Sequence, residues 1–198
     1  MPDLTLAMND LKHVRQAHIV SVGNECKELL LLLGQGEGVP TEDIPIHCVN
    51  FTGAPVPQSL TFTRRQEKDC ACPCTPLLKS YLYEPNASVL KAGAFRSLAL
   101  LYKVEKLHPN SHLYTSDSLL PDFPGRKFRI DSSCGFSKKE MKEMLAAGKK
   151  ANLTVRNFPA TVAELRKRLK LAEGGDTYLF ATTLADERKV LIRCRTAG

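Results

Sequence analysis

The last third of the chain contains two helix-start signals, and they constrain its fold more than any other feature. A Ser or Thr followed three residues later by Glu forms a capping box, because the two residues bond backbone N–H groups that the helix leaves free. One box begins at Ser137 and the second at Thr161. Strand-like sequence follows each helix, and Gly174-Gly175 ends the second helix. The expected strands are 152–156, 177–184 and 189–195. Residues 131–198 are therefore predicted to fold in the order α-β-α-β-β.

The second of these helices is predicted to be amphipathic. Apolar residues recur at helical spacing and form one stripe, while basic residues occupy the opposite, exposed side. The apolar stripe is Val162, Leu165, Leu169 and Ala172, and the basic side is Arg166, Lys167 and Lys170.

The net charge of +7 is placed unevenly along the chain. Residues 129–198 hold 15 basic and 8 acidic residues, whereas residues 1–128 hold 13 of each kind. A compact basic module is typical of proteins that bind a polyanion, most often nucleic acid. A solubilising surface would have the same composition, so charge alone leaves both interpretations open.

The middle of the chain is predicted to pass from a strand directly into a helix. Tyr81 to Tyr83 suit a strand, and Pro85 fits the first position of a helix, where its missing N–H is not needed. Apolar residues at helical spacing then predict a helix of about four turns from Asn86, with Leu98 in the core.

Four polar residues near this junction are candidate contacts for a substrate or for a neighbouring domain: Glu84, Asn86, Lys91 and Arg126. A strand end that meets a helix start often binds anions through free N–H groups, but Glu84 adds negative charge there. A structural interpretation is equally simple, because Asn86 and Glu84 could satisfy the first turn and Lys91 could pair with an acid. The sequence leaves the two interpretations open.

Residues 1–52 are predicted to be part of a larger sheet. A short helix over 3–13 is followed by apolar strands, two of which form a hairpin at Gly23-Asn24. The expected strands are 18–22, 28–33 and 44–51. One helix and three strands are too few to bury a core, so we expect exposed apolar surface or self-association through this segment.

Gly34-Gln-Gly36-Glu-Gly38 resembles a nucleotide-binding loop only in its glycines. Such a loop must open a helix that faces the phosphates, but here Pro40 and Pro45 follow without a helical period. We therefore interpret it as an ordinary loop.

The cysteines and histidines do not predict a metal site. Seven cysteines at uneven spacing are not a disulfide framework, and Cys70, Cys72 and Cys74 lack the second pair of a structural zinc site. His108 and His112 are separated by Pro109 and Asn110, which exclude an aligning helix.

Several motifs, in order along the chain, resemble one family. They are Y-L-Y-E-P-N-A-S-V-L-K-A-G at 81–93, K-L-H-P-N-S-H-L-Y-T-S-D at 106–117, F-P-G-R-K-F at 123–128 and V-R-N-F-P at 155–159. Together they resemble bacterial class I S-adenosylmethionine-dependent methyltransferases that end in a ferredoxin-like domain and a THUMP-like domain. The likeness covers essentially the whole chain.

This resemblance implies an α+β protein in three parts. Residues 1–52 would be a remnant of a Rossmann-like methyltransferase sheet, 53–130 the ferredoxin-like domain and 131–198 the THUMP-like domain. The cofactor loop of such an enzyme lies in its first strand–helix unit, and nothing before Asp3 supplies one. S-adenosylmethionine is thus expected in a missing N-terminal methyltransferase domain. No catalytic, cofactor-binding or metal residue is predicted in this chain, which we expect to be inactive alone.

The resemblance further implies that the parent enzyme methylates a structured RNA, tRNA or rRNA, and that the THUMP-like domain positions it. The candidate phosphate-binding residues are Lys149, Lys150, Arg156, Arg166, Lys167 and Lys170. The competing hypothesis is a protein-interaction or scaffolding module with a solvated basic face. Which RNA and which nucleotide the enzyme acts on stay open.

The sequence also predicts a cytoplasmic protein. No apolar run approaches the 18 or so residues of a membrane span, and Met1-Pro2-Asp3 does not begin a secretory signal.

Overall fold

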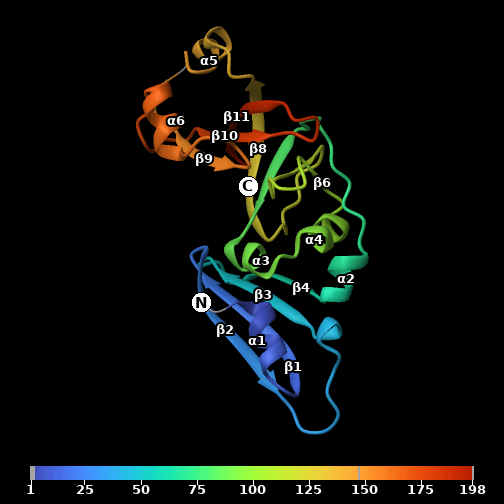
Figure 1. Ribbon diagram of the computed structural model, residues 1–198. Coiled ribbons are helices and arrows are strands. Elements are labelled where there is room, and N and C mark those ends of the chain that lie inside the picture. Colours follow the sequence, from blue (N-terminus) through green and yellow to red (C-terminus); the bar gives the residue numbers. More distant parts are fainter. Residues whose placement is uncertain (1–2, 147, 198) are drawn as a thin grey trace. The chain divides into compact units, whose positions relative to one another are not determined.

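The computed structural model describes residues 3–146 and 148–197, and most of its elements are labelled in Figure 1. The chain divides into two compact units. The first unit comprises Met1–Cys72, Pro85–Lys103 and Asp122–Gly125. The second unit comprises Pro73–Glu84, Val104–Pro121 and Arg126–Gly198.

The first unit is built on a mixed sheet with the strand order β2-β1-β3-β4. Its strands are β1 (Val14–Val22), β2 (Glu25–Leu33), β3 (Ile46–Phe51) and β4 (Gln58–Phe62). The predicted hairpin joins β1 to β2, and its turn residues Gly23 and Asn24 both have positive φ, as such tight turns require. β3 then pairs parallel to β1, on the side away from β2.

Helices accompany this sheet: α1 (Leu4–Asp10), the short 3-10 helix η1 (Thr41–Asp43), α2 (Arg64–Asp69), α3 (Ala87–Ala92) and α4 (Phe95–Tyr102). The predicted four-turn helix from Asn86 is wrong, because Gly93 takes the left-handed conformation and ends α3. The chain restarts as α4, whose first N–H groups donate to the carboxylate of Glu67. The predicted burial of Leu98 is confirmed.

β2 is an edge strand that its own unit leaves largely uncovered. It contains five consecutive leucines, and no residue of the strand is fully buried. Leu30, Leu32 and Leu33 are each about half exposed. The expected exposure of apolar strand surface in this part of the chain is therefore found.

The second unit is built on a mixed sheet with the strand order β6-β7-β5-β8-β11-β10-β9. Its strands are β5 (Tyr81–Pro85), β6 (Glu105–Lys106), β7 (Tyr114–Ser116), β8 (Gly125–Cys134), β9 (Asn152–Arg156), β10 (Tyr178–Thr183) and β11 (Lys189–Thr196). Its helices are α5 (Lys138–Met144) and α6 (Val162–Leu169). From residue 138 onwards the elements run α-β-α-β-β, as predicted, and the α+β class is confirmed.

Alternate residues of β10 and β11 supply two separate cores, because side chains of a strand point to opposite faces in turn. On one face, Leu179 and Leu191 pack with the apolar residues of α5 and α6. On the other face, Phe180 and Ile192 pack with Leu82 of β5 and with its neighbours.

Both predicted capping sites are present. Thr161 accepts the N–H of Glu164, and the Glu164 carboxylate accepts the N–H of Thr161 at 2.7 Å. Ser137 accepts the N–H of Glu140, whose carboxylate accepts the N–H of Gly135. Hydrogen bonds from Thr161 hold the pKa of Glu164 below its usual value, and bonds from Ser137 and Gly135 do the same for Glu140.

The predicted stripe on α6 is only half right. Leu165 and Leu169 are buried, but Val162 is 38% exposed. α6 ends at Leu169, since Lys170 takes the left-handed conformation, so Ala172 lies beyond the helix and is exposed. Leu171, just after that turn, is buried instead.

Candidate nucleic-acid interface

A groove with a basic rim runs between α5 and α6 of the second unit. Its volume is about 490 Å³. Apolar side chains of Met141, Leu145 and Leu169 contribute to the lining. The basic lining residues are Lys138 and Lys142 of α5, Lys149 of the following loop and Arg168 of α6. Lys138 and Lys142 are four residues apart and therefore lie on the same face of their helix.

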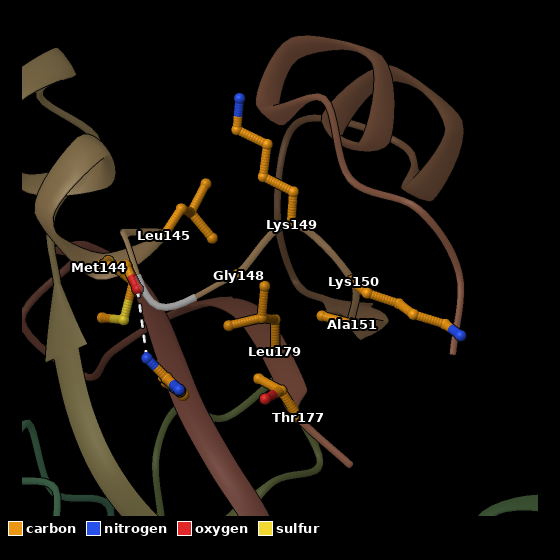
Figure 2. Close-up of a pocket in the computed structure, with 9 residues that line it drawn as sticks. Met144, Leu145, Gly148, Lys149, Lys150, Ala151, Thr177 and Leu179 are labelled. Atoms are coloured by element: carbon orange, nitrogen blue, oxygen red, sulfur yellow. Dashed lines mark hydrogen bonds between the residues drawn. The ribbon is translucent and has the colours of Figure 1, made fainter. Parts of the chain in front are cut away.

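A second pocket of about 200 Å³ shares Leu145, Gly148 and Lys149 with the groove. It is also lined by Lys150, by Arg193 of β11 and by Leu179 of β10. Figure 2 shows the side chains of Lys149 and Lys150 extending in different directions, away from Leu179. The Nη1 of Arg193 donates to the carbonyl oxygen of Met144 at 3.4 Å, which joins β11 to the end of α5.

The backbone that carries the two lysines is fixed by hydrogen bonds to Ala172. The N–H of Ala172 donates to the carbonyl of Lys149 at 2.7 Å, and the N–H of Ala151 donates to the carbonyl of Ala172 at 3.0 Å. The side chain of Lys150 lies against Gly174, where an added Cβ would meet its Cε at 3.2 Å. The structure therefore holds both lysines at the pocket by main-chain contacts and leaves their ammonium groups exposed.

Among the described residues, the linings of the groove and the second pocket include six basic residues and no carboxylate. A concave surface lined by one sign of charge concentrates counter-ions and attracts ligands of the opposite charge. Lysine ammonium groups act as point charges toward phosphates and release counter-ions when they bind them. The geometry thus suits a polyanion.

The basic residues predicted on the exposed side of α6 differ in their exposure. Lys167 and Lys170 are exposed, as expected. Arg166 is not on the wet side, because its side chain is only 19% exposed and its Nη1 donates to the carbonyl of Ala151 at 3.3 Å. The predicted exposure of Arg166 was wrong, since its long side chain folds back from α6 onto the carbonyl of Ala151, the residue before β9. Cations in the last turn of α6 also stabilise the helix dipole, so part of their role is structural.

Arg156 and Arg126, two further candidates, converge on Glu84. The Nη2 of Arg156 donates to Oε1 of Glu84 at 2.8 Å, and the Nε of Arg126 donates to Oε2 at 2.8 Å. The Glu84 side chain is 3% exposed. Three strands separate β5 from β9 in the strand order, so this contact is not one between neighbouring strands.

Asn86 and Lys91 belong to the first unit, whereas Glu84, Arg126 and Arg156 belong to the second. Asn86 is buried and caps α3, since its side-chain oxygen accepts the N–H of Val89 at 3.1 Å and the hydroxyl of Ser88 at 2.7 Å. Asn86 therefore satisfies the first turn of α3, as the structural interpretation of this junction proposed. Lys91 is exposed in the last turn of α3. The N–H of Leu6 is the main cause of the lowered pKa of Asp3, and the charge of Lys91 adds a smaller effect.

Thiol or metal chemistry finds little support in the described part of the chain. Within 3–146 and 148–197, no group of His, Cys, Asp and Glu is arranged to hold a metal ion. Burial raises the pKa of Cys48 to about 12 and also raises that of Cys194, so both thiols are poor nucleophiles.

Gly34–Gly38 is a loop followed by η1, a 3-10 turn of three residues. None of the described helices is long and apolar enough to cross a membrane.

Sequence reasoning missed four lining residues: Lys138, Lys142, Arg168 and Arg193. The signal for the first two was present, because the capping box at Ser137 fixes the helix and a spacing of four places both lysines on one face. Arg168 and Arg193 could not be placed from sequence, since their position at the groove depends on how α6 and β11 pack.

Two known domain families match consecutive parts of this chain. A ferredoxin-like domain family matches residues 81–124, and a THUMP domain-like family matches residues 125–196. The chain carries a ferredoxin-like domain followed by a THUMP-like domain. The boundaries we predicted at residues 52 and 130 stay predictions. The candidate groove lies wholly within the THUMP-like domain.

A solved structure supports this assignment over nearly the whole chain. The crystal structure of a putative methyltransferase from Porphyromonas gingivalis W83 is 39% identical in sequence, with a TM-score of 0.91. The match covers 99% of this chain and 49% of that chain, so this chain corresponds to the C-terminal half of that protein. A search of curated proteins gave no significant match.

Proposed function

We propose that this chain is the RNA-recognition region of an S-adenosylmethionine-dependent RNA methyltransferase. The observation that carries the proposal is the groove of the THUMP-like domain, whose lining holds basic residues and no carboxylate among the described residues. The name of the similar solved protein supports a methyltransferase parent. A cytoplasmic location follows from an RNA substrate.

In this proposal, the groove holds the phosphates of a structured RNA. Lys142, Lys149, Lys150 and Arg168 contact the backbone, and Lys167 and Lys170 extend the basic surface along α6. Contacts of this kind position an RNA without reading its sequence, because structured RNA is recognised mostly through its shape and phosphates. The base to be methylated would then be chosen by the catalytic domain.

The test compares two kinds of charge removal on the same helix. Lys138→Ala/Lys142→Ala removes two charges that line the groove, and Lys139→Ala removes an exposed charge that does not line it. We expect the double variant to weaken binding of a structured RNA and to reduce the slope of log K against log salt by about two. The Lys139→Ala control should change the slope little.

Binding would be measured by fluorescence anisotropy over a salt series. If structured RNA does not bind even at about 50 mM salt, where phosphate contacts are strongest, the protein-interaction hypothesis is preferred. If Lys139→Ala changes the slope by as much per charge removed as the double variant does, general charge, not the groove, attracts RNA.

The cofactor part of the proposal is tested separately. This chain is expected to give no heat of binding with S-adenosylmethionine in isothermal titration, since the cofactor half is assigned to the rest of the parent enzyme. A micromolar site in this chain would contradict that division.

A further inference from the structure

The Glu84 cluster differs from the other contacts between arginines and carboxylates in this structure. Elsewhere in the described residues, each such carboxylate meets one arginine, as Asp131 meets Arg195. Glu84 meets two, Arg126 and Arg156, and therefore carries one negative charge against two positive charges. Each arginine holds one oxygen of the carboxylate, Arg126 the Oε2 and Arg156 the Oε1, so the three side chains together keep one excess positive charge.

Both guanidinium groups remain accessible although the carboxylate is buried. The side chains of Arg126 and Arg156 are 43% and 38% exposed, whereas that of Glu84 is 3% exposed. Each arginine uses Nε and Nη2 to hold Glu84. Within the described part of the chain, neither Nη1 has a hydrogen-bond partner, so each arginine keeps its third nitrogen for another acceptor.

Phe128 and His112 lie near the two arginines and bring no negative charge to them. The guanidinium carbon of Arg126 lies 5.4 Å from the centre of the Phe128 ring, a cation–π contact that restrains its orientation. Burial, with the nearby charges of Lys106 and Arg156, lowers the pKa of His112 to about 4. This imidazole is therefore neutral at pH 7 and neither adds nor removes charge. The two guanidinium groups are thus pre-oriented with an excess positive charge.

We infer that Arg126 and Arg156, held by the buried Glu84, form a phosphate-binding site separate from the groove. This inference rests on the proposed function for the identity of the ligand, a phosphodiester of the bound RNA. Arg156 ends β9, and Lys150 precedes the start of that strand. A strand rises about 3.3 Å per residue, so the two sites are about 20 Å apart along it. One structured RNA can reach both.

The site is tested first on the unmodified protein, by NMR of the arginine Nε–H groups. Inorganic phosphate and a structured RNA are titrated separately. We expect the signals of Arg126 and Arg156 to shift with either ligand, while that of Arg195, which is paired one to one with Asp131, does not move.

A variant then measures how much the guanidinium of Arg156 contributes to RNA binding beyond its charge. Arg156→Lys keeps the charge but loses the fork, and we expect roughly tenfold weaker RNA binding, as for the loss of one charged hydrogen bond. Arg195→Lys is the matched control and should bind RNA like the parent. The NMR titration decides the question even if Arg156→Lys folds poorly.

The outcomes separate this inference from the proposed function. If RNA binds through the groove but the signals of Arg126 and Arg156 do not move, the site is a structural cross-link and the inference is overturned. If inorganic phosphate moves both signals but RNA does not bind, the site stands as an anion site and the proposed function fails. If neither ligand moves them, the inference is wrong.

Discussion

Large apolar side chains reach solvent mainly in the first unit, whereas positive charge gathers in the second. The first unit holds 9 basic and 10 acidic residues, and the second holds 19 basic and 11 acidic residues. Most of the exposed large apolar residues belong to the first unit, including three leucines of β2. An exposed apolar strand edge favours association with protein, and a basic groove favours a polyanion. The two units are therefore suited to different kinds of partner.

The largest expected effect comes from a charge placed in the core of the first unit. Leu98→Asp buries an unpaired carboxylate on α4 and should unfold the unit, since such a charge costs several kcal/mol. Leu101→Asp, on the same helix but 58% exposed, is the control and should fold normally. Urea unfolding followed by circular dichroism measures both. A stable, folded Leu98→Asp protein would show that Leu98 does not face the core of the unit.

The second prediction tests whether the apolar edge of the first unit meets protein. We expect the isolated chain to self-associate through β2, and Leu30→Lys/Leu32→Lys to abolish this without unfolding the chain. Each leucine buried in an interface contributes about 1.5–3 kcal/mol, so the dimer should weaken by two or more powers of ten. Sedimentation equilibrium measures the association. A parent chain that stays monomeric at high concentration would remove the self-association hypothesis.

The third prediction concerns pH and the second unit. Burial lowers the pKa of His112 to about 4, from the usual histidine value of about 6.5. The unfolded chain therefore takes up a proton as pH falls through 6.5, and the folded chain does not until about pH 4. The free energy of unfolding should therefore keep this contribution of His112 above pH 6.5. It should fall between pH 6.5 and pH 4, by up to about 3 kcal/mol. Measurement is by urea unfolding at pH 7 and pH 4.5.

His112→Asn is the control for this pH dependence. His112 has a positive φ of 54°, a conformation that Asn tolerates well, and Asn does not titrate. The variant should lose most of the difference in stability between the two pH values. If it keeps the whole difference, other groups cause it.

The smallest effect separates the structural role of α6 from its charges. Thr161→Ala removes the helix cap and should cost about 1 kcal/mol of stability, with RNA affinity nearly unchanged. Lys167→Ala/Lys170→Ala should do the reverse, because exposed single charges contribute little to stability. Thermal unfolding and anisotropy measure the two effects. Equal loss of affinity in both variants would mean that the position of α6, rather than its lysines, matters to the RNA.

Local signals in the sequence predicted much of this fold. The capping pairs that begin at Ser137 and Thr161, the hairpin at Gly23-Asn24 and the strand-like runs at 177–184 and 189–195 each depend on residues a few positions apart. Such short-range patterns restrict backbone conformation before any packing occurs. The division of the predicted four-turn helix at Gly93 was missed, because a helical period continued across it in the apolar residues while the backbone turned left-handed.

The sequence by itself thus determined the order of the elements in the last third of the chain, the basic character of that part and the resemblance to its family. Only the tertiary structure decided which basic side chains are exposed to solvent and which are paired within the protein. It folded Arg166 back onto the carbonyl of Ala151 and placed Lys138 and Lys142 in one groove with Arg168. It also brought Glu84 of β5 against Arg156 of β9. The physical reason is that periodicity fixes the face of one element, whereas a charge is paired or exposed according to contacts between elements that are distant in sequence.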